Sequence, residues 1–241
     1  TPLKIHEFYR IFVRSCKLAY PSSGDTFTMT DEPPYPRFAS RGRAYVYVVP
    51  CRDEDLLKLG FSRDPFTRFT TLHRRFFEFF DLDRGLLVDA ERVAAARRIE
   101  RSLIDAFTDY HAMAPLVVPA TAGGHTEWYR GAHPGVAGLL RRIATEEGLA
   151  LQEGLRPWLR AHLMTRADLL HDWSLRIVET LDWARHNAPG DPGAVRLRQA
   201  LLDTWAMFEA AGIDMRSLVP ESVTHWYDHG EHRRLFGDDS G

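Results

Sequence analysis

Cysteine is scarce in this sequence, which holds two in 241 residues. Cys16 and Cys51 are too few for a disulfide framework or a thiolate zinc site, and their scarcity fits a reducing compartment, so we expect a cytoplasmic protein. Long apolar runs are missing too. No stretch reaches the roughly 18 apolar residues that a transmembrane helix needs, and the first residues lack the apolar segment of a secretory signal peptide. We therefore expect no membrane partner.

An excess of basic charge is also missing. The chain has 31 lysines and arginines against 33 aspartates and glutamates, which gives a net charge of −2. A nucleic-acid ligand would need a local basic patch, because the overall charge offers it no attraction. The chain is, however, 44% hydrophobic, and at this length it is expected to form one or two ordinary globular domains.

The pattern of apolar residues and chain breakers divides the sequence into three parts. Residues 1–42 hold a helical pattern at 4–18, followed by a linker rich in proline, serine and glycine. Residues 43–150 mix short strand patterns with helical ones. Residues 155–235 carry long helical patterns interrupted at 187–193, which predicts an appended helical hairpin or small bundle.

The middle part contains the elements on which the chemistry depends. Its β-branched and aromatic runs predict two strands joined by the polar turn CRDED. Asp64 followed by Pro65 is a good helix start, with a capping carboxylate and a proline at the first helical position. The expected segments are strands at 43–50, 56–61 and within 77–89, and helices at 64–76, 90–109 and 136–147.

Five residues recur in these elements where an apolar core would not need them. Tyr47 lies on the first strand, and Lys58 follows it by 11 positions on the second. Gly60 ends that second strand, and Arg68 follows it by 8 positions on the next helix. Glu100 lies on the most periodic helix, in the run ERSLIDAF.

These residues at this spacing resemble the GIY-YIG nuclease superfamily, and most closely its subgroup named after a phage T5 open reading frame. Members of the subgroup read YVYV, then KIG and an arginine, and later EWF. The counterparts here are YVYV at 45–48, KLG at 58–60 and EWY at 127–129, and the resemblance covers residues 43–145. The lysine of KLG stands where other members have a second tyrosine. Ile104 replaces a frequent histidine, and a catalytic asparagine of some relatives has no counterpart.

The resemblance implies an α/β (α+β) fold with a small three-stranded, mostly antiparallel sheet flanked by helices, to which the helical C-terminal region is appended. It also implies a divalent-metal-dependent endonuclease that hydrolyses phosphodiester bonds in DNA. In that function Tyr47 activates water, Arg68 binds the scissile phosphate and Glu100 holds Mg²⁺ or Mn²⁺. Lys58 and His73 support them, His73 as an alternative base. One carboxylate suffices chemically, because Mg²⁺ takes only one or two from a protein.

Substrate contacts are expected from a basic surface beside this set, since arginines track phosphates. Plainer roles remain open for the same residues: cross-strand packing for the tyrosines, solvated or ion-paired positions for the arginines and Glu100, and a core position for Trp128. The expected substrate-binding residues are Tyr45, Gly60, Arg63, Arg75, Arg97, Arg101 and Trp128.

Other functions fit the same sequence. The fold could be catalytically inactive and bind nucleic acid or protein, or it could belong to a toxin or defence component. In either case the C-terminal helices would dock a protein partner or self-associate. His225, His229 and His232 have a spacing that would make a metal-binding face on a helix, although their surroundings are rich in glycine. Cys51 lies in a polar turn and is expected to be incidental rather than nucleophilic.

Overall fold

A computed structural model describes residues 42–123 and 125–229, all of which fall in one compact unit. The N-terminal helix and linker predicted for residues 1–42, and His232, therefore lie outside the described residues, except for Gly42. The strands are β1 Tyr45–Pro50, β2 Leu56–Ser62, β3 Leu86–Asp89, β4 His111–Ala112, β5 Trp128–Arg130 and β6 Ala150–Glu153.

The described strands form one sheet in the order β4-β5-β2-β1-β3-β6, and every pairing in it is antiparallel. The expected mixed fold with an antiparallel sheet is thus confirmed. The expected three-stranded sheet is wrong, because six strands pair within the described part of the chain. The three strands that were missed are short and partly polar, so they lack the alternation that reveals a strand in a sequence.

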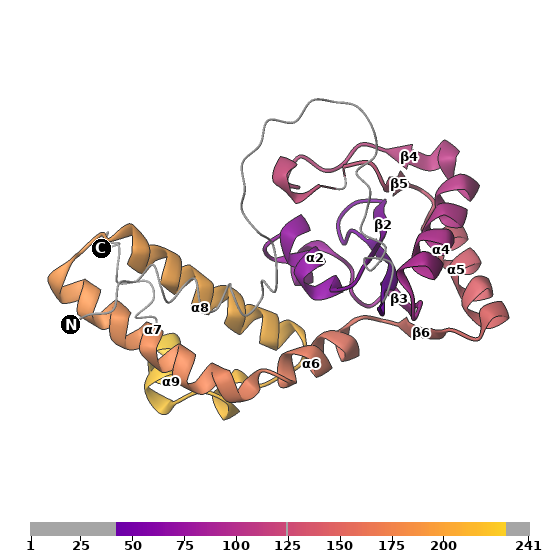
Figure 1. The fold of residues 1–241 in the computed structure, drawn as a ribbon. Helices are drawn as coiled ribbons and strands as arrows, with labels where there is room; N and C mark the ends of the chain where they lie inside the picture. Colours follow the sequence, from indigo (N-terminus) through magenta and orange to yellow (C-terminus); the bar gives the residue numbers. More distant parts are fainter. Residues whose placement is uncertain (1–41, 124, 230–241) are drawn as a thin grey trace. The chain divides into compact units, whose positions relative to one another are not determined.

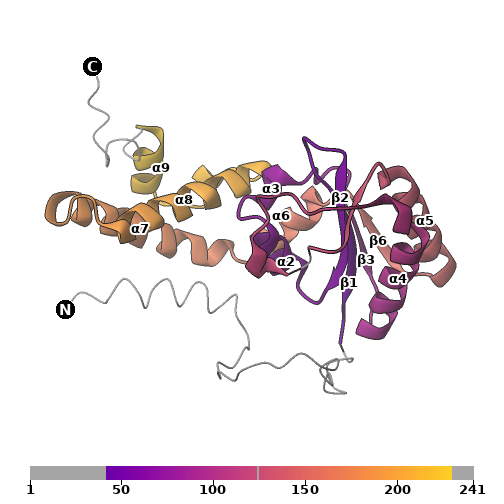
Figure 2. The ribbon, with the colours of Figure 1, turned by 90° about the horizontal axis from the view of Figure 1, so that it is seen from above.

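Helices cover both faces of this sheet (Figures 1 and 2). The longer elements agree with the expected segments to within a few residues. The helices are α2 Pro65–Leu72, α3 Phe76–Phe79, α4 Val93–Ala106, α5 His133–Glu147, α6 Arg156–Met164, α7 Ala167–Asn187, α8 Pro192–Ala210 and α9 Glu221–Asp228, with 3₁₀ turns η2 Thr108–Tyr110, η3 Ala120–Ala122 and η4 Met215–Ser217.

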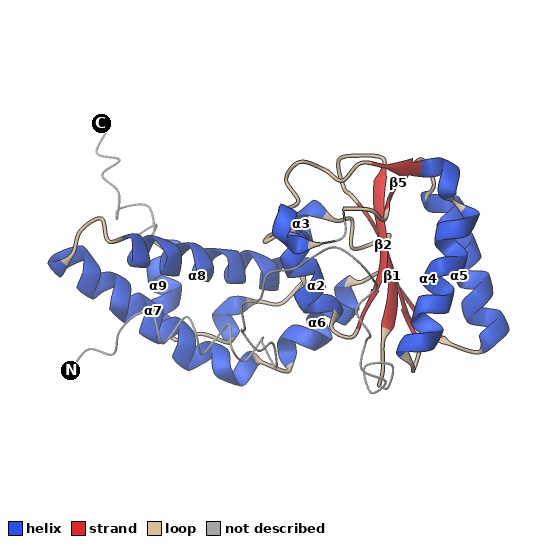
Figure 3. Ribbon diagram, turned by 45° about the horizontal axis from the view of Figure 1, so that its top comes forward, coloured by secondary structure: helices blue, strands red, loops and turns tan. Residues whose placement is uncertain are grey.

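The period-two alternation of β1 separates two cores. Val46 and Val48 point to the face covered by α4 and α5, where Ile99 and Leu103 of the periodic helix are buried. The opposite face carries Tyr47 and is covered by α2, α3 and α6, as the edge-on sheet in Figure 3 shows.

The C-terminal helices share the core of the Tyr47 face. The Trp158 ring on α6 meets the Phe69 ring on α2 edge-on at 5.9 Å, and the apolar cluster continues into α7, α8 and α9. The interruption predicted at residues 187–193 is confirmed, because α7 ends at Asn187 and α8 begins at Pro192. A bilayer-spanning helix, long and apolar enough to cross, does not occur among the helices described.

Candidate active site

Tyr47 and Gly60 face each other across the β1–β2 pair. The Tyr47 side chain is 1% exposed, and its ring passes over Gly60. A Cβ placed on Gly60 would lie 2.5 Å from the Tyr47 hydroxyl oxygen, which is far inside van der Waals contact. The Tyr47 ring therefore requires glycine at position 60. This cross-strand pairing accounts for the spacing between YVYV at 45–48 and KLG at 58–60.

Arg68 reaches the Tyr47 hydroxyl from α2. The helix begins after Asp64, whose carboxylate accepts hydrogen bonds from the Thr67 amide and hydroxyl. One turn further along, Arg68 Nε donates to the Tyr47 hydroxyl oxygen at 3.3 Å. Arg68 Nη1 and Nη2 donate to the carbonyls of Ala122 and Gly123 at 2.5 and 3.0 Å, so the connection between β4 and β5 is held against this guanidinium.

Lys58 is a buried ammonium on the same face of the sheet, with 1% of its surface exposed. Its Nζ donates to Glu127 Oε2 at 2.7 Å and to the Glu127 carbonyl at 3.3 Å. Glu127 directly precedes β5, and its carbonyl also accepts from the Leu59 amide at 3.1 Å. Beyond that bond β5 separates from β2, since their ladder extends only as far as Lys58 and Trp128.

Glu100 reaches this open edge of β2 from α4. Its carboxylate accepts a hydrogen bond from the backbone amide of Phe61. That amide lies two residues beyond Leu59, so it points to the same side of the strand and would otherwise lack a partner from β5. Glu100 thus occupies the gap that opens in the sheet beside Gly60.

The ionisable groups around this gap perturb one another. Burial raises the pKa of the Glu100 carboxyl to about 7; the charge of Glu127 adds to the rise, and Lys58 opposes it. Burial lowers the pKa of Lys58, against the hydrogen bond and charge of Glu127. Burial likewise raises the pKa of Tyr47, whereas Arg68 opposes that rise and the two carboxylates add to it. Four secondary-structure elements and the residue before β5 therefore contribute to one electrostatically coupled cluster.

Three other predicted residues take packing positions. Trp128 is fully buried and stacks on Phe80 at a ring distance of 6.3 Å, so its surroundings favour the core role considered above. The His73 ring stacks on Phe79 at 4.6 Å at the far end of α2, and its Nδ1 is buried with no hydrogen-bond partner among the described residues. Tyr45 is half-buried and packs against the core of the Tyr47 face.

The predicted arginines divide into two groups. Arg63, Arg97 and Arg101 are exposed, and the Arg97 guanidinium lies over the Phe61 ring at 5.7 Å beside the open edge of β2. Arg75 instead pairs with Glu78 and with Asp203 of α8, with nitrogen–oxygen distances of 2.5 and 2.7 Å. The structure thus gives Arg75 a tie between α3 and α8, a role that the basic-surface interpretation did not include.

Glu127 is the site residue to which the sequence interpretation assigned no role. It entered only as part of the EWY run, without chemistry of its own. Its partner Lys58 lies 69 positions away, so no local pattern in the sequence indicated the ion pair.

The carboxylates of this cluster suit a hard divalent cation. No group of three or more His, Cys, Asp or Glu side chains that could hold a metal occurs within 42–123 and 125–229. Mg²⁺ needs fewer, since it keeps several waters and takes one or two carboxylates. Burial and a neighbouring negative charge disfavour ionised Glu100, and a bound cation would relieve both effects. Glu100 therefore fits the metal ligand implied by the resemblance.

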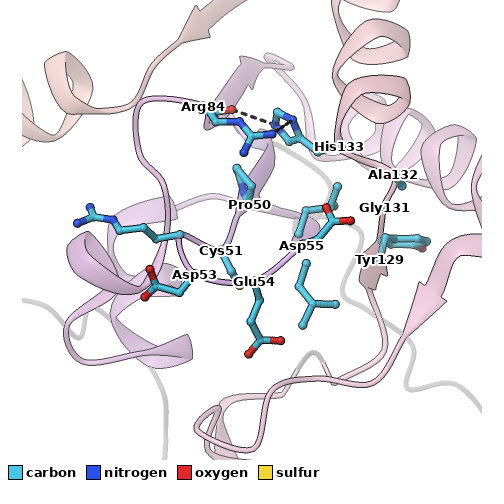
Figure 4. A pocket seen from close by; sticks show the side chains of 13 residues that line it. Pro50, Cys51, Asp53, Glu54, Asp55, Arg84, Tyr129, Gly131, Ala132 and His133 are labelled. Atoms are coloured by element: carbon cyan, nitrogen blue, oxygen red, sulfur yellow. Dashed lines mark hydrogen bonds between the residues drawn. The ribbon is translucent and has the colours of Figure 1, made fainter.

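A separate polar pocket of about 270 Å³ lies at the other end of β2, at the β1–β2 turn and the start of α5 (Figure 4). Arg84 Nη2 and His133 Nδ1 are 3.1 Å apart on one side, and the carboxylates of Asp53 and Glu54 lie on another. Cys51 also lines it; burial raises the pKa of its thiol to about 12, so the sulfur is a poor nucleophile.

Comparisons of the chain with models of known protein families, with curated proteins and with solved structures found no match.

Proposed function

We propose that the chain is a divalent-metal-dependent endonuclease of the GIY-YIG kind that cleaves phosphodiester bonds in DNA. One observation carries the proposal: the four residues expected to be catalytic gather where β5 separates from β2. Arg68 donates to the Tyr47 hydroxyl, Lys58 is buried on the same face of the sheet, and Glu100 reaches the Phe61 amide from α4. A packing or solvated role for each residue would not require the four to converge. The exposed Arg63, Arg97 and Arg101 supply positive charge for the phosphates on either side.

In this proposal each side chain has a task that its surroundings support. Arg68 donates to the scissile phosphate, and Lys58 contributes positive charge next to it. Tyr47 remains a hydroxyl at neutral pH because its pKa is raised, so it acts as a relay. Its oxygen takes the proton of the attacking water and it passes its own proton to solvent. The water oxygen bonds to phosphorus, the bond to the leaving oxygen breaks, and that oxygen takes up a proton from solvent. A divalent ion at Glu100 would supply Lewis-acid stabilisation of the developing charge.

Substrate entry in this proposal requires a local rearrangement. Tyr47 and Lys58 are each 1% exposed, and the carbonyls of Ala122 and Gly123 occupy Arg68. A phosphate would replace these neutral acceptors with a charged one, which a guanidinium can bind through two parallel hydrogen bonds. The β4–β5 connection would then move away as substrate binds.

The test is cleavage of supercoiled plasmid and of single-stranded DNA with Mg²⁺ or Mn²⁺. We expect nicking by the wild type, and losses of at least about 100-fold in Glu100→Gln and Tyr47→Phe. Glu147→Gln is the matched control, since that glutamate pairs with Arg98 on the outside of α4 and α5. No cleavage by the wild type with either metal, or equal cleavage by Glu100→Gln, would remove the proposal.

A second candidate is a non-catalytic module that binds nucleic acid or protein. The burial of Tyr47 and Lys58 favours it, because a closed site needs no catalytic use. The C-terminal helices expose three large apolar side chains that a protein partner or a second copy would cover, as in a defence or toxin component. These are Met164, Leu169 and Trp183, exposed by 43%, 66% and 54%.

A further inference from the structure

The Lys58–Glu127 pair is built more tightly than an ordinary ion pair. Lys58 is 1% exposed, and among the described residues its hydrogen bonds go to two oxygens of Glu127, at 2.7 and 3.3 Å. A buried ammonium has lost its hydration, so it depends on these oxygens for its charged form. One residue thus supplies both the counter-charge and the hydrogen-bond acceptors of this lysine.

Glu127 is itself fixed from three directions. The Thr126 hydroxyl donates to Oε1 at 2.5 Å, which leaves Oε2 facing Lys58. The Glu127 carbonyl accepts from the Leu59 amide at 3.1 Å, and the next residue enters the β2–β5 ladder. Carboxylate and backbone are therefore both held, and the position of Lys58 Nζ follows from theirs.

We propose that Glu127 is a positioning residue of the active site, which holds the Lys58 ammonium beside Tyr47 and Arg68. The inference rests on the proposed nuclease function. In that function the Lys58–Glu127 pair places a charged donor next to the reacting phosphate. Lys58 acts only through its charge, so no bond is made or broken at Glu127.

A different role for the same side chain would be direct metal binding together with Glu100. The hydrogen bonds favour positioning, because Oε2 is engaged by Lys58 and Oε1 by Thr126. The two roles give different results when Lys58 is removed. If Glu127 only positions Lys58, changing Glu127 should have no further effect on cleavage once Lys58 is removed. If Glu127 binds the metal, the change should still lower cleavage.

The experiment is a double-mutant cycle on DNA cleavage in Mg²⁺, using the wild type, Glu127→Gln, Lys58→Met and the double variant. We expect Glu127→Gln to lower kcat on the order of 100-fold with KM nearly unchanged, since a misplaced group costs rate rather than binding. Glu127→Asp should restore part of the rate. The double variant should be no slower than Lys58→Met alone. Lys58→Met with Glu127→Leu replaces the pair by apolar side chains, and it should fold with the wild-type melting temperature yet remain slow.

Three results would contradict the inference, and they can be told apart. Unchanged kcat in Glu127→Gln would show that the carboxylate does not position Lys58. Losses that multiply in the double variant would show that Glu127 acts independently, as a metal ligand would. Absence of cleavage by the wild type would overturn the proposed function and this inference together, whereas the first two results leave the nuclease function intact.

Discussion

The Tyr47 ring covers Gly60, its cross-strand partner, so closely that the pair behaves as one structural unit. Tyr47 cannot easily move aside, because Phe69 meets it edge-on at 5.1 Å and Arg68 binds its hydroxyl. Tyr47 can therefore hold this position only because residue 60 has no Cβ.

Gly60→Ala should destabilise the protein by about 1–3 kcal/mol, the usual cost of overpacking a filled core. It should also lower cleavage, because the Tyr47 hydroxyl must shift. Urea denaturation of the variant gives the first quantity and plasmid nicking the second. In a Tyr47→Ala background the added methyl should cost far less.

Gly138→Ala is the control for that change. Gly138 lies within α5, and a Cβ there would meet nothing within 4 Å. The substitution should stabilise by roughly 0.5–1 kcal/mol through helix propensity. Equal effects at the two glycines would show that the contact with Tyr47 is not the cause.

The elements around Tyr47 and Gly60 could largely be predicted from the sequence, because the patterns that indicate them are local. The two strands, the start of α2 and the period of α4 follow from alternation, capping and an apolar stripe. The spacing of Tyr47, Gly60 and Arg68 follows from the register of one hairpin and the helix after it.

The rest depends on contacts between distant residues, which no local pattern reveals. Lys58 and Glu127 are 69 positions apart, and Arg75 and Asp203 are 128 apart. β4, β5 and β6 are held by their neighbours in the sheet rather than by their own periodicity. The number of strands was therefore underestimated, and the ion pair between Arg75 and Asp203 could not be predicted, since both depend on which segments the fold brings together.

Asp203 is expected to stabilise the packing of α8 against the start of α3 rather than to contribute to the active site. It is 8% exposed on α8 and pairs with Arg75 Nη1 at 2.7 Å and with Arg74 Nε at 2.5 Å. Asp203→Ala should lower the free energy of unfolding by about 1–3 kcal/mol, less than for a fully buried pair because both arginines are partly exposed. Thermal or urea unfolding measures this.

The exposed Arg216–Asp228 pair provides the comparison. Asp228→Ala should cost much less than Asp203→Ala, because solvent screens an exposed pair. DNA affinity should be unaffected by Asp203→Ala in the folded protein. A large loss of affinity without loss of stability would support the expected contact between Arg75 and the substrate.

The contribution of Glu100 to the stability of the metal-free protein should fall as pH rises from about 4.5 to 7. The pKa of Glu100 is raised from 4.5 to about 7, so the folded state holds a proton that the unfolded state has released. Glu100→Gln removes this dependence. Relative to the wild type it should be more stable at pH 8, by about 1–2 kcal/mol after allowance for partial exposure, and equal at pH 4.

Two comparisons test whether Glu100 causes this pH dependence of stability. Glu147→Gln should change stability with the opposite sign, because pairing with Arg98 lowers the pKa of Glu147 and its contribution is lost as pH falls. Mg²⁺ should raise the melting temperature of the wild type above pH 7 but not that of Glu100→Gln. A metal effect that survives Glu100→Gln would place the ion elsewhere.

Gly123 should control access to Arg68. Its backbone has φ 60° and ψ 160°, a region open essentially to glycine alone, and its carbonyl accepts from Arg68 Nη2. Gly123→Ala should strain the β4–β5 connection by about 1–3 kcal/mol and weaken its hold on the guanidinium. Faster proteolysis near residue 123 and a several-fold lower KM for a short oligonucleotide are then expected.

Gly148→Ala is the matched control, because Gly148 also has a positive φ, of 64°, but lies at the end of α5. Faster proteolysis of Gly123→Ala with an unchanged KM would show that this connection does not shield the site.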